Sequence, residues 1–268
     1  MFLTERKLDR RITEIREYSY REVTALEGFA AREDEQGVVN PEVPTSFEGW
    51  DVIHTGDRWS GRDRYLWLHK EITIPETWKG KRAVGIFDFG KTGAGNNSGF
   101  EAMCYINEKP YQGVDANHKE VFFPEELYGK TFRLTFRLWS GLEGGVPRVQ
   151  EHRINRADLA YLDEKVDNFY YMGMLVLDTV QNLADTDPVK FELRNALDEA
   201  CLLIDWAYPG SAEFYESVHR ADDLLNEKID GMKKDSLVKV KCVGHTHIDM
   251  AWLWRLKHTH TSLMCGLS

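Results

Sequence analysis

The spacing of apolar residues changes along the chain, and each change predicts a different kind of structure. Leu8, Ile12 and Ile15 recur at helical spacing among charged residues, which predicts an amphipathic helix from residue 3 to about residue 34. Two prolines shortly after residue 40 interrupt this pattern. The chain is therefore expected to open with a helical segment, which we place at residues 1–40.

Between about residues 50 and 139 the pattern shifts to short alternating runs that are separated by Gly, Asn and Pro. Four of these runs are predicted to be strands: Tyr65–Ile74, Ala83–Phe89, Ala102–Ile106 and Thr131–Leu138. Short strands at this spacing are typical of a β-sandwich of the jelly-roll kind. We place this accessory domain at residues 41–155.

Helical spacing returns after residue 155 and predicts a helical connector at residues 156–235. Its helices are expected at residues 157–183, as one helix or a broken pair, at residues 189–208, and from a cap at Ser211 to Gly231.

A β-patterned run then begins at Val238 and is expected to be the first strand of a truncated, barrel-like α/β domain at residues 236–268. The fold class is therefore α+β: a leading helix, a β-sandwich, a helical connector and the start of an α/β domain.

Composition narrows the classes of partner. The 268 residues are 42% hydrophobic, enough for one large domain or two smaller ones. A formal net charge of −10 argues against nucleic acid and against an anionic membrane as partners. The apolar runs are too short to span a bilayer, and the four cysteines are far apart in the sequence. These features predict a reduced, cytoplasmic protein.

Two weaker motifs have plain structural explanations. Residues 85–92 match the phosphate-loop pattern, but their middle four residues read as a strand, so we do not predict a nucleotide site. Trp59 and Trp139 each lie beside small residues near a predicted strand end. Such tryptophans could stack on a sugar or pack at the rim of the sandwich, and the sequence leaves both readings open.

The strongest motif follows the Val238 run. His245, His247 and Asp249 are each two residues apart, and side chains at this spacing point the same way on an extended chain. Two imidazoles and a carboxylate that converge at a strand end suit a divalent cation such as zinc. The alternative is that His245 caps a turn and Asp249 caps the following helix, without a metal.

The run Gly244–Trp254, G-H-T-H-I-D-M-A-W-L-W, resembles the start of the catalytic domain in glycoside hydrolase family 38, the α-mannosidases of bacterial intracellular type. The resemblance implies a zinc-dependent retaining glycosidase. His247 and Asp249 would be its first two zinc ligands and Trp252 the aromatic wall of its sugar subsite. It gives His245 no role as a ligand.

In that family the nucleophile, the acid/base carboxylate and a further zinc histidine lie far downstream, and no residue of this chain takes their place. We therefore expect this chain to be the N-terminal portion of an α-mannosidase, inactive by itself and weak in zinc binding. Its substrate would be an α-mannoside or oligosaccharide. One alternative is a non-catalytic carbohydrate-binding or oligomerisation module, with a homo-oligomer left open. Another is the start of an amidohydrolase-like metal hydrolase.

Overall fold

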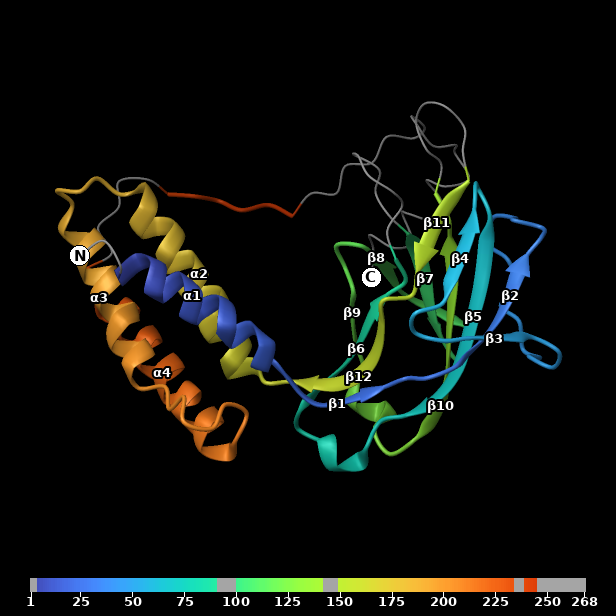
Figure 1. The fold of residues 1–268 in the computed structure, drawn as a ribbon, viewed down its shortest axis with the longest axis horizontal. Coiled ribbons are helices and arrows are strands. Elements are labelled where there is room, and N and C mark those ends of the chain that lie inside the picture. Colours follow the sequence, from blue (N-terminus) through green and yellow to red (C-terminus); the bar gives the residue numbers. More distant parts are fainter. Residues whose placement is uncertain (1–3, 91–99, 142–148, 234–238, 245–268) are drawn as a thin grey trace. The chain divides into compact units, whose positions relative to one another are not determined.

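A computed structural model describes residues 4–90, 100–141, 149–233 and 239–244. The chain divides into two compact units (Figure 1). We call residues 1–21 and 162–242 the helical unit, and residues 22–161 and 243–268 the sandwich unit.

Four α-helices form the helical unit within the described residues. They are α1 (Thr4–Ile15), α2 (Glu164–Asn182), α3 (Pro188–Leu202) and α4 (Ala212–Gly231), and a short 3-10 turn, η1 (Arg16–Tyr18), follows α1. Leu8, Ile12 and Ile15 are fully buried against apolar residues of α2, α3 and α4. The Ser211 side chain accepts a hydrogen bond from the backbone N–H of Phe214 and so caps α4, as predicted.

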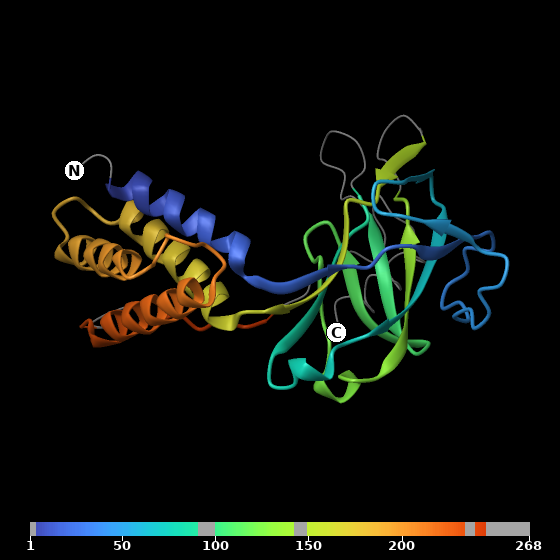
Figure 2. The ribbon, with the colours of Figure 1, turned by 60° about the horizontal axis from the view of Figure 1, so that its bottom comes forward.

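The sandwich unit contains two main sheets and a short two-stranded sheet (Figures 1 and 2). The six-stranded sheet has the order β3 (Asp51–Ile53), β2 (Phe29–Asp34), β5 (Tyr65–Thr73), β10 (Thr131–Trp139), β7 (Glu101–Ile106) and β8 (Lys109–Asp115). The four-stranded sheet has the order β1 (Tyr20–Ala25), β12 (Arg156–Leu162), β6 (Arg82–Asp88) and β9 (Glu120–Phe122). The two-stranded sheet pairs β4 (Arg58–Gly61) with β11 (Gln150–Arg153), and two 3-10 turns lie at Glu76–Trp78 and Glu125–Leu127.

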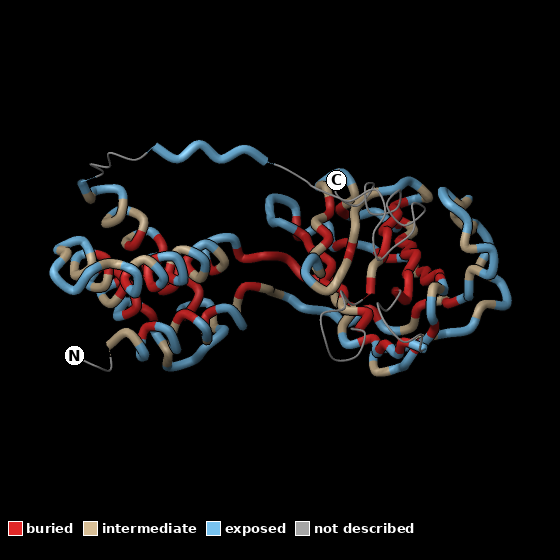
Figure 3. The backbone as a smooth tube through the Cα atoms, turned by 90° about the horizontal axis from the view of Figure 1, so that it is seen from above, coloured by how far each residue is buried: buried red, intermediate tan, exposed pale blue. Residues whose placement is uncertain are grey.

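Alternate residues of both sheets point inward and form one apolar core, visible as buried stretches along the strands in Figure 3. Phe87 of β6 and Phe136 of β10 meet there, with ring centroids 4.6 Å apart. Every neighbouring pair in the six-stranded sheet is antiparallel, and Phe136 lies opposite Leu68 in the register of β10 with β5. The second face of this sheet is therefore free to carry a different set of side chains.

The four strands predicted between residues 65 and 138 are confirmed as β5, β6, β7 and β10. The reading of the phosphate-loop pattern is confirmed where it is described, because Gly85–Asp88 belongs to β6. A Cβ at Gly85 would lie 2.5 Å from the Phe87 ring, so this glycine makes room for an aromatic side chain.

Three helix predictions extend too far. The helix predicted at residues 189–208 ends at Leu202. The first helix ends at Ile15 rather than near residue 34, and residues 20–25 and 29–34 are strands. The helix predicted at residues 157–183 begins at Glu164, because residues 156–162 form β12. In both of these strand regions sheet partners satisfy the backbone hydrogen bonds and pack alternate apolar residues, which outweighs local helical spacing.

The strand predicted from Val238 is not formed in its described part. Residues 239–244 carry no strand, and Val240 and Val243 are 79% and 85% exposed. An extended run needs a neighbouring strand to satisfy its backbone groups, and these residues have no assigned pairing.

The described chain is thus mixed α and β, with antiparallel sheets in a sandwich and four helices. The barrel-like domain at residues 236–268 lies largely outside the described residues, and the domain boundaries after residues 40, 155 and 235 stay predictions. The compact units divide the chain after residues 21, 161 and 242. Among the described helices, none combines the length and apolar character needed to cross a bilayer.

Candidate functional site

The outer face of the six-stranded sheet carries a mixed aromatic and charged surface. Trp67 of β5 and Met103 of β7 flank Arg137 of β10 in the strand register, because Arg137 lies opposite both. Trp67, Met103 and Tyr105 form a small apolar cluster that is separate from the sandwich core. The alternation of the strands therefore builds a second side-chain layer on this face.

Residues 35–50, which we call the covering segment, cross this outer face. Val43 and Trp50 pack on the Trp67 cluster. The Arg32 guanidinium lies over the Trp50 ring at 4.6 Å from its centroid. The covering segment is thus held on the sheet by side-chain contacts with several strands.

Arg137 is the most deeply buried charge on this face, with only 4% of its side chain exposed. Its Nε and Nη2 atoms donate to Oδ2 of Asp34 at 2.9 and 2.6 Å, and Nη2 also donates to the carbonyl of Val38 at 2.9 Å. The guanidinium stacks over the Tyr65 ring at 4.1 Å. Asp34 in turn accepts from two backbone N–H groups through Oδ1 and shapes the turn that enters the covering segment.

His69 fixes the far part of the covering segment. Its ring stacks on Phe47 with centroids 3.3 Å apart and an interplanar angle of 2°. Its Nδ1 atom lies 2.9 Å from Oγ1 of Thr135. Burial and, to a smaller extent, the nearby Arg133 lower the pKa of His69 to about 4, and Glu108 opposes both effects. The imidazole is therefore neutral at pH 7, which suits an apolar stack with Phe47.

A cleft of about 730 Å³ opens between the end of β2 and the covering segment. We call it the first cleft. Its lining combines carboxylates, amides, a guanidinium and an indole, among them Arg32, Glu33, Glu35, Gln36, Glu42 and Trp67. Its volume is that of a small-molecule site, and its lining offers many hydrogen-bonding groups beside one large ring.

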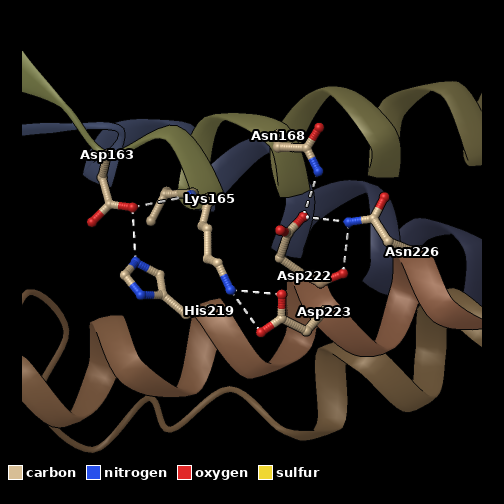
Figure 4. Close-up of polar contacts among 8 residues, drawn as sticks. Asp163, Lys165, Asn168, His219, Asp222, Asp223 and Asn226 are labelled. Carbon is tan, nitrogen blue, oxygen red and sulfur yellow. Dashed lines mark hydrogen bonds and ion pairs between the residues drawn. The ribbon is translucent and has the colours of Figure 1, made fainter. Parts of the chain in front are cut away.

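The helical unit holds a second polar cluster (Figure 4). Asp163 caps α2 by accepting from the Val166 N–H, and its carboxylate also accepts from His219 at 2.8 Å and Arg21 at 3.4 Å. The Arg21 guanidinium lies 3.8 Å above the Tyr215 ring. These bonds join the start of α2 to α4.

The remaining contacts of this cluster also link α2 to α4. Asp222 accepts from Asn168 at 2.6 Å and from Asn226 at 3.0 Å, and Lys165 bonds Asp223 (Figure 4). Burial raises the pKa of Asp222, and the two amide hydrogen bonds oppose that rise. Each carboxylate of the cluster accepts a hydrogen bond from a side chain on α2 or α4, and Asp163 also accepts from Arg21 of β1. We therefore assign this cluster to the stability of the helical unit.

The metal ligands predicted from the sequence, His247 and Asp249, lie outside the described residues, as do His245 and Trp252. Within the described part of the chain, no group of three or more His, Cys, Asp or Glu is arranged to hold a metal ion. The zinc site stays a prediction. Zinc content measured after incubation with the metal, in the native chain and in His247→Ala, tests it.

Trp59 and Trp139 are packed at the rim of the sandwich. Trp59 is 8% exposed and stacks on His152 at 4.2 Å, and its Nε1 donates to the carbonyl of Phe89. Trp139 is 7% exposed and donates to Asp63. Of the two readings of these tryptophans, packing fits the described contacts.

Sequence reasoning missed Trp67, Arg137 and Asp34. One signal was present: Arg133 and Arg137 alternate with buried Phe and Leu along β10, which marks the outer face. The pairing of Arg137 with Asp34 joins residues 103 positions apart, so the sequence pattern did not indicate it.

Comparisons with known proteins give no family assignment. No family model matches the chain, and no curated protein matches it. Similar solved structures include a β-glucuronidase from an uncultured Clostridium sp., with a TM-score of 0.38 and 16% identity over 53% of this chain and 29% of that one. A Faecalibacterium prausnitzii β-glucuronidase gives a TM-score of 0.38 and 15% identity over 54% of this chain and 32% of that one. A Ruminococcus gnavus β-glucuronidase gives a TM-score of 0.37 and 11% identity over 54% of this chain and 29% of that one.

The predicted membership of glycoside hydrolase family 38 is wrong on these comparisons. No family model supports it, and the similar solved structures named above are β-glucuronidases rather than α-mannosidases. The prediction depended on residues 244–254, a short motif at one end of the chain. The α-mannoside specificity that was predicted from this resemblance therefore has no support either. The matched region spans less than a third of the first similar structure, 29% of its length.

Proposed function

We propose that the sandwich unit is a non-catalytic carbohydrate-binding module of a glycoside hydrolase-type protein, and that the first cleft binds the sugar. The observation that carries this proposal is the cleft of about 730 Å³ on the outer sheet face, with Trp67 among polar side chains. Sugar hydroxyls pair with carboxylate, amide and guanidinium groups, while the C–H face of a pyranose packs on an aromatic ring. The cleft offers exposed polar groups for the hydroxyls, and Trp67, which is 4% exposed, is the aromatic side chain in its lining.

The charges of the first cleft favour a neutral sugar. Glu33 is paired with Arg64, and Asp34 is paired with Arg137. Two exposed carboxylates in the lining, those of Glu35 and Glu42, then remain, with Arg32 as the one basic residue of the described lining. The lining therefore has an excess of negative charge. A uronic acid would add a negative charge to this surplus, so we expect the cleft to bind neutral sugars more tightly than acidic ones.

Isothermal titration of the full chain tests this proposal. The probes are cellotetraose, maltotetraose and mannotetraose as neutral sugars, with tetragalacturonate as the acidic one. We expect binding of at least one neutral probe and weaker binding of tetragalacturonate. Glu35→Ala, in the cleft lining, should weaken the neutral probe about tenfold, the loss of one charged hydrogen-bond partner.

Glu48→Ala is the matched control. Glu48 is an exposed glutamate of the same covering segment, and it does not line the first cleft. The affinity of Glu48→Ala for the neutral sugar should equal that of the native chain. Absence of binding with all four probes would refute the sugar-binding role and favour the alternative of an oligomerisation module, which sedimentation of the chain would then reveal.

A further inference from the structure

A second cleft, of about 410 Å³, opens on the same outer face of the six-stranded sheet. Its lining includes Val43, Met103, Tyr105, Pro110 and Arg137. Most of these side chains are apolar or aromatic, unlike the carboxylate-rich lining of the first cleft. The second cleft therefore offers packing for C–H faces more than charged hydrogen bonds.

The two clefts share one wall. Asn40, Pro41 and Glu42 of the covering segment line both of them. Asn40 and Glu42 are exposed, so each side chain is open to a ligand in the clefts it lines. The clefts are thus neighbours along the covering segment rather than separate features of the surface.

The floor beneath this wall is continuous. Arg137 lines the second cleft, while its guanidinium bonds Asp34, which lines the first. In the strand register Arg137 lies between Trp67 of the first cleft and Met103 of the second. The backbones of β5 and β7 are therefore two strand spacings apart at this position, about 10 Å, which is longer than one pyranose ring. The side chains of Trp67 and Met103 pack in one cluster between the two clefts.

We propose that the two clefts are two subsites of one groove across the sheet, and that its ligand is a neutral oligosaccharide of two or more units. This inference rests on the proposed function of the first cleft. The first subsite holds one sugar by its hydroxyls, and the second packs the next unit against Pro110, the exposed apolar residue of its lining. Glu42, which lines both subsites, lies where the two units join.

A chain-length series tests the groove. Affinity is measured by isothermal titration for the neutral sugar type that binds best, as the mono-, di-, tri- and tetrasaccharide. We expect an increase of about tenfold or more from the monosaccharide to the trisaccharide, because a second subsite adds contacts. Equal affinity for all four lengths would overturn the groove and leave the single-site function standing, whereas no binding at any length would overturn both.

Blocking variants separate the two subsites. Pro110 lines only the second cleft and is exposed, so Pro110→Trp fills that cleft with an indole. It should reduce the affinity for the trisaccharide to that of the monosaccharide and leave monosaccharide binding unchanged. Gln36, which is exposed and lines only the first cleft, gives the converse variant. Gln36→Trp should weaken every length.

Lys109→Trp is the matched control, since Lys109 is exposed, neighbours Pro110 on β8 and lines neither cleft. It should bind all lengths like the native chain. Equal weakening of monosaccharide and trisaccharide by Pro110→Trp, with Lys109→Trp unaffected, would contradict the assignment of two subsites.

Discussion

Both units bury a charged side chain almost completely, but they use it differently. In the helical unit the Asp163 carboxylate, 7% exposed, is bonded by a helix N-terminus, His219 and Arg21. In the sandwich unit the Arg137 guanidinium, 4% exposed, is bonded by Asp34 and the Val38 carbonyl. The partners of Asp163 are the first turn of α2, His219 of α4 and Arg21 of β1. The partners of Arg137 are Asp34 and Val38, at the start of the covering segment that lines both clefts.

This difference teaches how to read a buried charge. A buried ion pair is weak evidence of added stability by itself, because desolvation offsets much of the attraction. The two buried charges differ in the elements of the fold that their partners belong to. Asp163 joins α2 to α4 and β1 by hydrogen bonds, while Arg137 holds the irregular covering segment on a sheet face. The first arrangement should matter to stability alone, and the second to stability and binding together.

The largest effect is expected from Arg137→Met. This variant leaves the Asp34 carboxylate buried without its partner, and we expect a loss of about 4 kcal/mol in the free energy of unfolding. Urea unfolding followed by tryptophan fluorescence measures it. Adding Asp34→Asn should restore part of the stability, because the uncompensated charge is removed.

The same variant also sharpens the comparison. If Arg137 only stabilised the sheet, the double variant Arg137→Met/Asp34→Asn would bind sugar like the native chain once folded. We expect its binding to stay weak, since the covering segment loses the bond from Arg137 to the Val38 carbonyl.

Asp163→Ala should cost about 3 kcal/mol, because it removes the cap of α2 and leaves Arg21 and His219 without their shared acceptor. Helical circular dichroism during urea unfolding measures the loss. Asp178→Ala, at an exposed position on the same helix, is the control and should change stability by less than about 0.5 kcal/mol. Sugar binding by the folded Asp163→Ala chain should be unchanged. Weaker binding would show that the helical cluster also serves the site.

The sequence predicted much of each unit where local spacing and tertiary packing agree. The stripe of Leu8, Ile12 and Ile15 and the cap at Ser211 are features of single helices, and the structure confirms them. Residues 20–34 and 156–162 were misread because their spacing suits more than one structure until a sheet partner is present. Strand pairing is non-local and therefore outweighs local helical spacing.

The candidate site was harder to predict than the fold for the same reason. Trp67, Arg137 and Asp34 come from three strands, and only the register of β2, β5 and β10 brings them together. Irregular residues 35–50 complete the clefts, and their spacing carries no periodic signal. The strongest sequence motif, around His247, lies outside the described residues.

A change of pH separates the two units further. The folded pKa of His69 is lowered to about 4, below the unfolded value near 6.5, so folding favours the neutral imidazole. Its contribution to stability is present above pH 6.5 and is lost as the pH falls towards 4. From the two pKa values, the loss at pH 5 is about 2 kcal/mol.

The difference in stability between the native chain and His69→Gln, measured at pH 8 and pH 5, isolates this contribution. Glutamine retains a polar group for Thr135 and does not titrate, so we expect the variant to lose less stability on acidification. Equal losses in both chains would show that His69 titrates normally beneath Phe47. The helical unit, followed by its circular dichroism, should not depend on this substitution.

The smallest effect is expected from Gly173→Ala, which asks how tightly the helical unit is packed. Alanine in a helix interior is normally more favourable than glycine by about 1 kcal/mol. Here a Cβ at Gly173 would lie 2.4 Å from Cδ1 and 2.9 Å from Cγ1 of the fully buried Ile12. Overpacking should exceed the helical gain and leave a net loss of about 1 kcal/mol. In an Ile12→Val background Cδ1 is absent, so Gly173→Ala should cost less there, as a thermal-unfolding double-mutant cycle would measure. A gain in stability in the native background would mean that Ile12 moves aside freely, and that α1 is packed more loosely against α2 than the sandwich core is packed around Phe87.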